Sequence, residues 1–194
     1  VFRERLAKNG MLHQANDFFR ATGAHTVLQY KEVNESLLRT RNSGGFQLLG
    51  LADFPGQGSA FVGILDAFWE SKGLVTPEKF RESCAPTVLL ARLPKRTFRN
   101  REKLKAKMEI YHFGKDALNS RKLNWTLIGE DGTVYHKGSL KTKSIQPATV
   151  DSLGIIELPL NGMDSAHKLT LKAELGGIHN EWDVWVYPEQ PKTE

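Results

Sequence analysis

The chain of 194 residues lacks several features that define whole classes of protein. It has a single cysteine, Cys84, which excludes an internal disulfide and a zinc site built on a cysteine cluster. No stretch approaches the roughly 20 apolar residues that a membrane-spanning helix requires. The six histidines show no spacing typical of metal ligands, so we expect no metal and no cofactor.

Internal repeats and low-complexity segments are also missing, and Val1 begins neither a signal peptide nor a natural start. We therefore expect a piece of a longer polypeptide. With 40% hydrophobic and 25% charged residues, the composition is typical of a globular protein and excludes disordered, collagen-like and coiled-coil classes.

The first part of the chain shows helical periodicity around one apolar run. Apolar residues three and four apart predict helices over residues 12–23 and 25–41, the first ending at Gly23. The nearly continuous apolar run 46–51 predicts a strand buried on both faces. A further helix is expected over residues 59–71, so that strand and helix form a βα unit.

A last short helix is expected with Thr76 as its N-cap, Pro77 as its first residue and its end near Ala85. From Pro86 onward, apolar residues recur at every second position instead of at helical spacing. Alternation of this kind, interrupted by turn residues, predicts an immunoglobulin-like antiparallel β-sandwich. The predicted strands cover residues 88–92, 104–112, 122–129, 133–140, 153–160, 168–175 and 182–187. We accordingly divide the chain into residues 1–85 and 86–194.

Four segments resemble family 2-type glycoside hydrolases, the group of β-galactosidases, β-mannosidases and β-glucuronidases. The sequence GGFQLLGLADFPGQG at 44–58 is similar to the end of their catalytic barrel, as is the preceding stretch 29–39. LDAFWESKG at 65–73 resembles the last barrel helix, and NEWDVWVYP at 180–188 resembles the closing strand of the sandwich that follows the barrel. The resemblance implies an α/β plus all-β fold class: residues 1–85 as the C-terminal portion of a (β/α)8 TIM barrel, then the immunoglobulin-like β-sandwich.

The same resemblance implies a function in carbohydrate metabolism, the hydrolysis of β-linked sugars with retention of configuration. The two glutamates that such enzymes use lie upstream of Val1, so the full-length chain is expected to be the enzyme and this piece alone to be inactive. The implied partners are a carbohydrate substrate and the upstream barrel and sugar-binding domains of the same polypeptide. The family further suggests a periplasmic or secreted protein.

Three residues near the predicted strand 46–51 are candidate substrate-binding residues. The resemblance places Asp53 at the barrel rim, where it binds a sugar hydroxyl or orders the loop; alternatively it caps the glycine-rich turn that follows. Gln47 points from the predicted strand into the barrel or is a satisfied core amide, and Gln57 contacts ligand or fills a turn. Glu35 is expected on a solvated helix face.

Two other functions remain open. The sandwich could be a non-catalytic carbohydrate-binding module that uses Trp182 or Trp185, and alternation places Trp182 on the face opposite Trp185 and Tyr187. The basic run 92–107 could bind nucleic acid. However, its lysines alternate with apolar residues as on the solvated face of a half-buried strand, so we expect no nucleic-acid partner and no membrane partner.

Overall fold

The structure, a computed structural model, describes residues 1–43, 45–56 and 61–189. The chain divides into two compact units, Val1–Arg81 and Glu82–Glu194, called unit 1 and unit 2 below. The predicted boundary lies after Ala85. Within the described ranges no helix is both long and apolar enough to cross a membrane.

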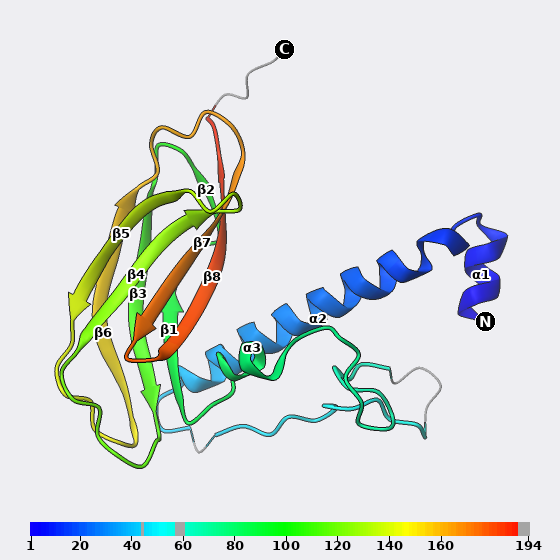
Figure 1. Cartoon of the computed structure of the whole chain (residues 1–194), viewed down its shortest axis with the longest axis horizontal. Helices are drawn as coiled ribbons and strands as arrows, with labels where there is room; N and C mark the ends of the chain where they lie inside the picture. Colours follow the sequence, from blue (N-terminus) through cyan, green and yellow to red (C-terminus); the bar gives the residue numbers. More distant parts are fainter. Residues whose placement is uncertain (44, 57–60, 190–194) are drawn as a thin grey trace. The chain divides into compact units, whose positions relative to one another are not determined.

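Unit 1 is helical at its two ends and irregular between them (Figure 1). It contains α1 (Phe2–Lys8), a 3-10 turn (Leu12–Gln14), α2 (Ala15–Leu38) and α3 (Pro77–Arg81). Between α2 and α3 the described residues form turns and isolated bridges rather than named strands. The start of the short helix predicted after Thr76 is confirmed, and Thr76 Oγ1 accepts a hydrogen bond of 3.2 Å from the Lys79 backbone N–H as its cap. Its predicted end near Ala85 is wrong, because α3 ends at Arg81.

The predicted helix end at Gly23 is wrong, because α2 runs through this residue without a break. Gly23 is buried and has no left-handed backbone angle. A Cβ placed on it would lie 2.3 Å from Leu74 Cδ2. This glycine therefore serves the close approach of the Leu74 side chain to the helix, not chain termination.

No strand forms over residues 46–51, so the predicted fold class is wrong and unit 1 is not a portion of a TIM barrel. Leu49 is 95% exposed, and Gly50 has φ +82°, outside the extended region. Instead, the Tyr30 hydroxyl donates a hydrogen bond of 3.0 Å to the Gly50 carbonyl. A strand buried on both faces needs neighbouring strands that satisfy its backbone, and the described part of unit 1 contains none.

Residues 61–71, the described part of the predicted helix 59–71, are also irregular. Asp66 Oδ1 accepts hydrogen bonds from the backbone N–H groups of Phe68 and Glu70, at 2.8 and 3.0 Å. Such local side-chain bonds compete with helical ones. Trp69 then takes a left-handed conformation with φ +67°, which a helix interior does not tolerate.

Glu35 is buried, contrary to the predicted solvated face. Its carboxylate lies between the side chains of Lys31 and Arg39, one turn away on either side along α2, and pairs with both. The distance from Arg39 Nη2 to Glu35 Oε2 is 2.7 Å. Two cations compensate the buried charge, so Glu35 has a structural role in the helix.

Unit 2 is a β-sandwich of two sheets (Figure 1). The small sheet has the strand order β1-β3-β6, and the large sheet has the order β2-β8-β7-β4-β5. The strands are β1 (Thr87–Arg92), β2 (Thr97–Arg99), β3 (Lys103–His112), β4 (Lys122–Gly129), β5 (Val134–Lys141), β6 (Thr149–Pro159), β7 (His167–Leu175) and β8 (Ile178–Tyr187). The strands predicted from the period of two are therefore confirmed.

The two sheets enclose one apolar core to which both contribute every second residue. On β3, Leu104 and Met108 are fully buried while Lys105 between them is exposed. On β8, Trp182 and Val184 are buried in the same core. The alternation leaves one face of each sheet outside the core. On the large sheet this outer face carries polar side chains, whereas on β1 of the small sheet Val88 and Leu90, which do not belong to the core cluster, are also buried.

The structure adds a strand that the sequence pattern did not predict. β2 is only three residues long, too short to show alternation, yet its Phe98 is 2% exposed and belongs to the core. β2 pairs with β8 in parallel, with Trp185 N–H donating 2.8 Å to the Arg96 carbonyl beside it. The large sheet is therefore mixed, whereas an antiparallel sandwich was predicted.

Candidate functional site

The outer face of the large sheet brings polar side chains from three strands into register. β7 lies between β4 and β8 and pairs with both in antiparallel fashion. Residues paired in this way point to the same face of the sheet. Two adjacent cross-strand rows result: Asn124, Glu174 and His179 form the first, and Thr126, Lys172 and Glu181 form the second.

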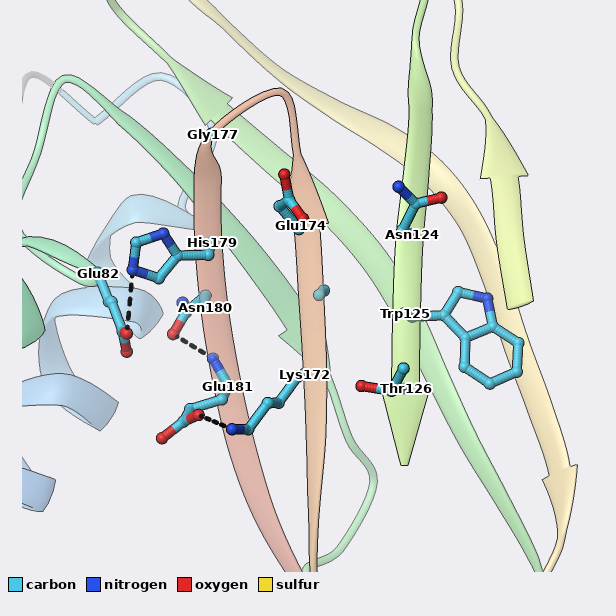
Figure 2. A pocket seen from close by; sticks show the side chains of 11 residues that line it. Glu82, Asn124, Trp125, Thr126, Lys172, Glu174, Gly177, His179, Asn180 and Glu181 are labelled. Carbon is cyan, nitrogen blue, oxygen red and sulfur yellow. Dashed lines mark hydrogen bonds and ion pairs between the residues drawn. The ribbon is translucent and has the colours of Figure 1, made fainter. Parts of the chain in front are cut away.

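These two rows line a pocket of about 440 Å³. Figure 2 shows their side chains on β4, β7 and β8, with Glu82 beside His179 and Gly177 at the turn between β7 and β8. The turn is tight because Gly176 and Gly177 both have positive φ, at +57° and +88°. All of the lining residues belong to unit 2, so the site is complete within one unit.

Two carboxylates of the pocket each have a nitrogen-containing side chain close by. His179 Nε2 lies 3.6 Å from a Glu82 carboxylate oxygen, and Lys172 Nζ lies 3.7 Å from Glu181 Oε2. Both distances exceed hydrogen-bond length, and the Lys172 and His179 side chains are half exposed or more. The partly exposed Lys172–Glu181 pair contributes about 0–1 kcal/mol. The Glu82 carboxylate, in contrast, is only 7% exposed, and its contact with His179 is an ion pair only when the imidazole is protonated.

Three polar side chains of the pocket have no protein partner among the described residues. These are the amide of Asn124, the hydroxyl of Thr126 and the carboxylate of Glu174. Together they offer donors and acceptors on adjacent strands, about 4.8 Å apart across the sheet. The pocket can therefore form several hydrogen bonds with a polar ligand without first breaking bonds within the protein.

Aromatic side chains lie farther along β8 on the same outer face. Trp185 is 37% exposed and Tyr187 is 41% exposed, whereas Trp182 is buried in the core at 1%. The predicted division of these residues between two faces is therefore confirmed. Of the two tryptophans considered for sugar stacking, Trp185 alone presents a ring to the outside.

The sequence-predicted site residues are distributed over the two units. Asp53 and Gln47 belong to unit 1, Trp185 belongs to unit 2, and Gln57 lies outside the described residues. Gln47 is exposed on an irregular segment. The substrate-binding roles of these residues stay predictions.

Asp53 is buried and organises the irregular part of unit 1. Its Oδ1 accepts hydrogen bonds from the Gly63 backbone N–H at 3.0 Å and from Lys72 Nζ at 2.7 Å. Lys72 also donates to the Gly63 carbonyl at 2.9 Å. A Cβ on Gly63 would lie 2.4 Å from the Ala52 backbone, so only glycine permits this close approach.

Within the basic run 92–107, Lys103, Lys105 and Lys107 lie on the solvated face of β3, as the alternation predicted, while Arg92 ends β1 and Arg99 lies on β2. Its cations are largely paired with carboxylates. Glu109, which is buried, receives Arg92 Nε at 2.8 Å and Lys107 Nζ at 3.0 Å. The positive charge of this run is therefore compensated in part, since Glu109 and Glu157 are each shared between two cations.

The pocket was not predicted from the sequence, although each strand that forms it has a recognisable pattern of outward-facing polar residues. Polar residues occupy alternate outward positions on every one of these strands, as at Asn124 and Thr126 on β4. Which outward pairs meet depends on strand order and register, which one sequence does not contain. Among the described residues, no group of three or more His, Cys, Asp or Glu side chains could hold a metal ion.

The family match found by comparison with known proteins lies within unit 2. Residues 102–188 match a family described as a domain of unknown function (DUF8488), and this range includes β3 to β8. No curated protein matches the chain. The matched range contains most of the pocket but not Glu82.

Several solved structures share a weak likeness with the chain. The sporulation control protein Spo0M of Bacillus subtilis is 17% identical, with a TM-score of 0.40, covering 55% of this chain and 50% of that one. Salmonella alpha-2-macroglobulin is 14% identical, with a TM-score of 0.42, covering 56% and 7%. A Paenibacillus cycloisomaltooligosaccharide glucanotransferase is 7% identical, with a TM-score of 0.41, covering 50% and 13%. The chain spans at most half of the length of each of these proteins, and likeness this weak says nothing about function.

Proposed function

We propose that unit 2 is a carbohydrate-binding module that holds a glycan across the outer face of the large sheet. One observation carries the proposal: the pocket presents an amide, a hydroxyl and a carboxylate without protein partners, from Asn124, Thr126 and Glu174. A sugar exposes many hydroxyl groups that both donate and accept hydrogen bonds. Convergent polar side chains of mixed type match that pattern.

The aromatic residues of β8 support the same function. Trp185 is four residues beyond Glu181 on the same face, about 13 Å along the strand. A glycan of several sugar units can therefore occupy the pocket and reach the ring of Trp185. The apolar face of the Trp185 ring can pack against the C–H groups of one sugar unit, while the pocket binds the hydroxyl groups of another.

The glycoside hydrolase function stays a prediction. The barrel strand that the resemblance implied next to Asp53 does not form. The described part of unit 1 offers no barrel, and the site described above needs none. A binding module acts without catalytic glutamates, so it is consistent with the expectation that this piece is inactive by itself. Because the proposed ligand is a glycan, we retain the predicted periplasmic or secreted location as part of this proposal.

The test is titration of the chain with a panel of neutral and charged oligosaccharides, followed by calorimetry and tryptophan fluorescence. We expect at least one glycan to bind, with the affinity reduced about tenfold or more by Glu174→Ala and by Trp185→Ala. The matched control is Ile155→Ala, which removes an exposed apolar side chain of the small sheet and leaves the affinity unchanged. A panel without any binder, or binding that both site variants leave intact, would refute the proposal.

A further inference from the structure

A basic strip adjoins the pocket on the same face of the large sheet. β5 pairs with β4 so that Lys141 lies opposite Lys122 and Lys137 lies opposite Thr126. Since paired residues share a face, these lysines extend the outer face beyond the pocket to the sheet edge. Arg121 and Lys143, immediately outside the two strands, add charge at the end where Lys122 and Lys141 lie.

The positive charge of this strip is not compensated. None of the five cations has a carboxylate within 4 Å among the described residues. The lysines on the outer face of β3 differ in this respect: Lys103 and Lys105 reach Glu157 at 3.1 and 3.8 Å. The strip therefore attracts anions more strongly than the longer basic run in the sequence does.

From this asymmetry we infer that the ligand of the site is an anionic polysaccharide, one whose sugars carry carboxylate or sulfate groups. The inference rests on the proposed carbohydrate-binding function and names the class of glycan. Uncompensated surface cations bind a repeating anion through several weak contacts at once. Lys172 in the pocket lies two strands from Lys137 in the same cross-strand row, so cations occur on both sides of Thr126.

The acidic residues of the face determine where the anionic groups bind. Glu174, Glu181 and Glu82 line the pocket and would repel a carboxylate or sulfate. The charged groups of the glycan should therefore lie over β4 and β5. Its neutral hydroxyls should lie over β7 and β8, where carboxylates accept their hydrogen bonds.

Arg121 borders both regions. A Cβ on Gly176 would lie 2.0 Å from Arg121 Nη1, so the guanidinium packs directly on the glycine turn between β7 and β8. This turn also contributes Gly177 to the pocket. A planar guanidinium at the pocket rim suits bidentate binding of a carboxylate or sulfate.

The composition of the strip favours a polysaccharide over a nucleic acid. The outward residues of β4 and β5 next to the lysines are Asn124, Thr126 and Ser139, which offer hydrogen bonds. Single-stranded nucleic acids are held by aromatic rings between the cations, on which the bases stack. No aromatic side chain stands among Lys122, Lys137 and Lys141 in the described register of these strands.

The experiment measures binding of the full chain to polygalacturonate oligomers and to the same oligomers after reduction of their carboxylates to alcohols. We expect the acidic oligomer to bind at least tenfold more tightly, and its affinity to fall as NaCl rises. The double variant Lys137→Ala/Lys141→Ala should remove most of this preference while the affinity for the reduced oligomer stays the same. The matched control, Lys103→Ala/Lys105→Ala, also removes two exposed lysines from one strand and should preserve the preference.

The outcomes separate the two proposals. Equal affinity for both oligomers, or a preference that survives the loss of Lys137 and Lys141, overturns the inference but leaves a carbohydrate-binding module. If neither oligomer nor any other glycan binds, the proposed function itself fails. Equally tight binding of single-stranded DNA of the same length overturns the inference, because the strip would then hold any polyanion.

Discussion

Replacement of Asp53 by asparagine tests whether this residue holds the irregular part of unit 1 together. The Asp53 and Lys72 side chains are 7% and 12% exposed, and their charged atoms are 2.7 Å apart. Asparagine keeps the acceptor for the Gly63 N–H but removes the charge opposite Lys72. Loss of one partner of a buried pair costs about 3–5 kcal/mol. We expect about 3 kcal/mol, because Lys72 keeps its bond to the Gly63 carbonyl.

Native-state hydrogen exchange measures this effect at single amides, whereas a global unfolding curve averages over both compact units of the chain. In Asp53→Asn, the amides of Asp53, Gly63 and Leu65 should lose protection by up to about 100-fold, since 1.4 kcal/mol corresponds to a factor of ten. Glu70→Gln is the control, because it neutralises an exposed carboxylate in the same segment. If both variants exchange like the parent, the ion pair does not hold the segment.

A double variant separates charge pairing from packing. Asp53→Asn/Lys72→Met removes both charges, so no ion is left buried without its partner. We expect its loss of protection to be smaller than the sum of the two single losses, a coupling that a double-mutant cycle reports directly. Strictly additive losses would show that the two side chains act independently.

Two further predictions concern unit 2, and both use urea unfolding followed by circular dichroism. Hydrogen bonds from the Lys95 side chain and from the Arg99 backbone N–H lower the pKa of Glu102 in the folded state. The ionised Glu102 carboxylate therefore stabilises the fold at pH values above its unfolded-state pKa. This stabilisation is lost as the pH falls through the lower folded-state pKa. Glu102→Gln should therefore weaken the decline of the unfolding midpoint on acidification, and an unchanged decline would contradict this. Trp182→Ala should cost about 3–5 kcal/mol because it empties a core position, whereas Trp185→Ala on the outer face should cost less than about 1 kcal/mol; equal costs would place both rings in one environment.

The sandwich strands could be predicted because burial on one face leaves a trace in the sequence. On β3 every buried Leu104 or Met108 has an exposed lysine beside it, and that alternation is local. The pocket, in contrast, is formed by residues that are far apart in the sequence. Asn124 and His179 are 55 positions apart and share one cross-strand row only through Glu174. Pairing of this kind follows from strand order, which the single sequence leaves open.

Unit 1 was mispredicted where glycine and aspartate have several structural uses. Gly23 was interpreted as a helix end, but it makes room for Leu74 inside α2. Asp66 occupies a segment with helical apolar spacing, yet its side chain bonds the backbone of a turn. Both residues are permissive rather than decisive, and the packing partner selects among the conformations they allow.

Charge shows most directly how strand pairing changes the meaning of a sequence. The run 92–107 has the densest positive charge in the chain, and it suggested a polyanion site. Cross-strand neighbours supply it with Glu109 and Glu157, so much of its field is cancelled. Lys137 and Lys141 attract no notice in the sequence, but their neighbours across the sheet are Thr126 and another lysine. The charge that a ligand encounters is therefore the sum of the side-chain charges on neighbouring paired strands. On the outer face of β4 and β5 that sum is positive.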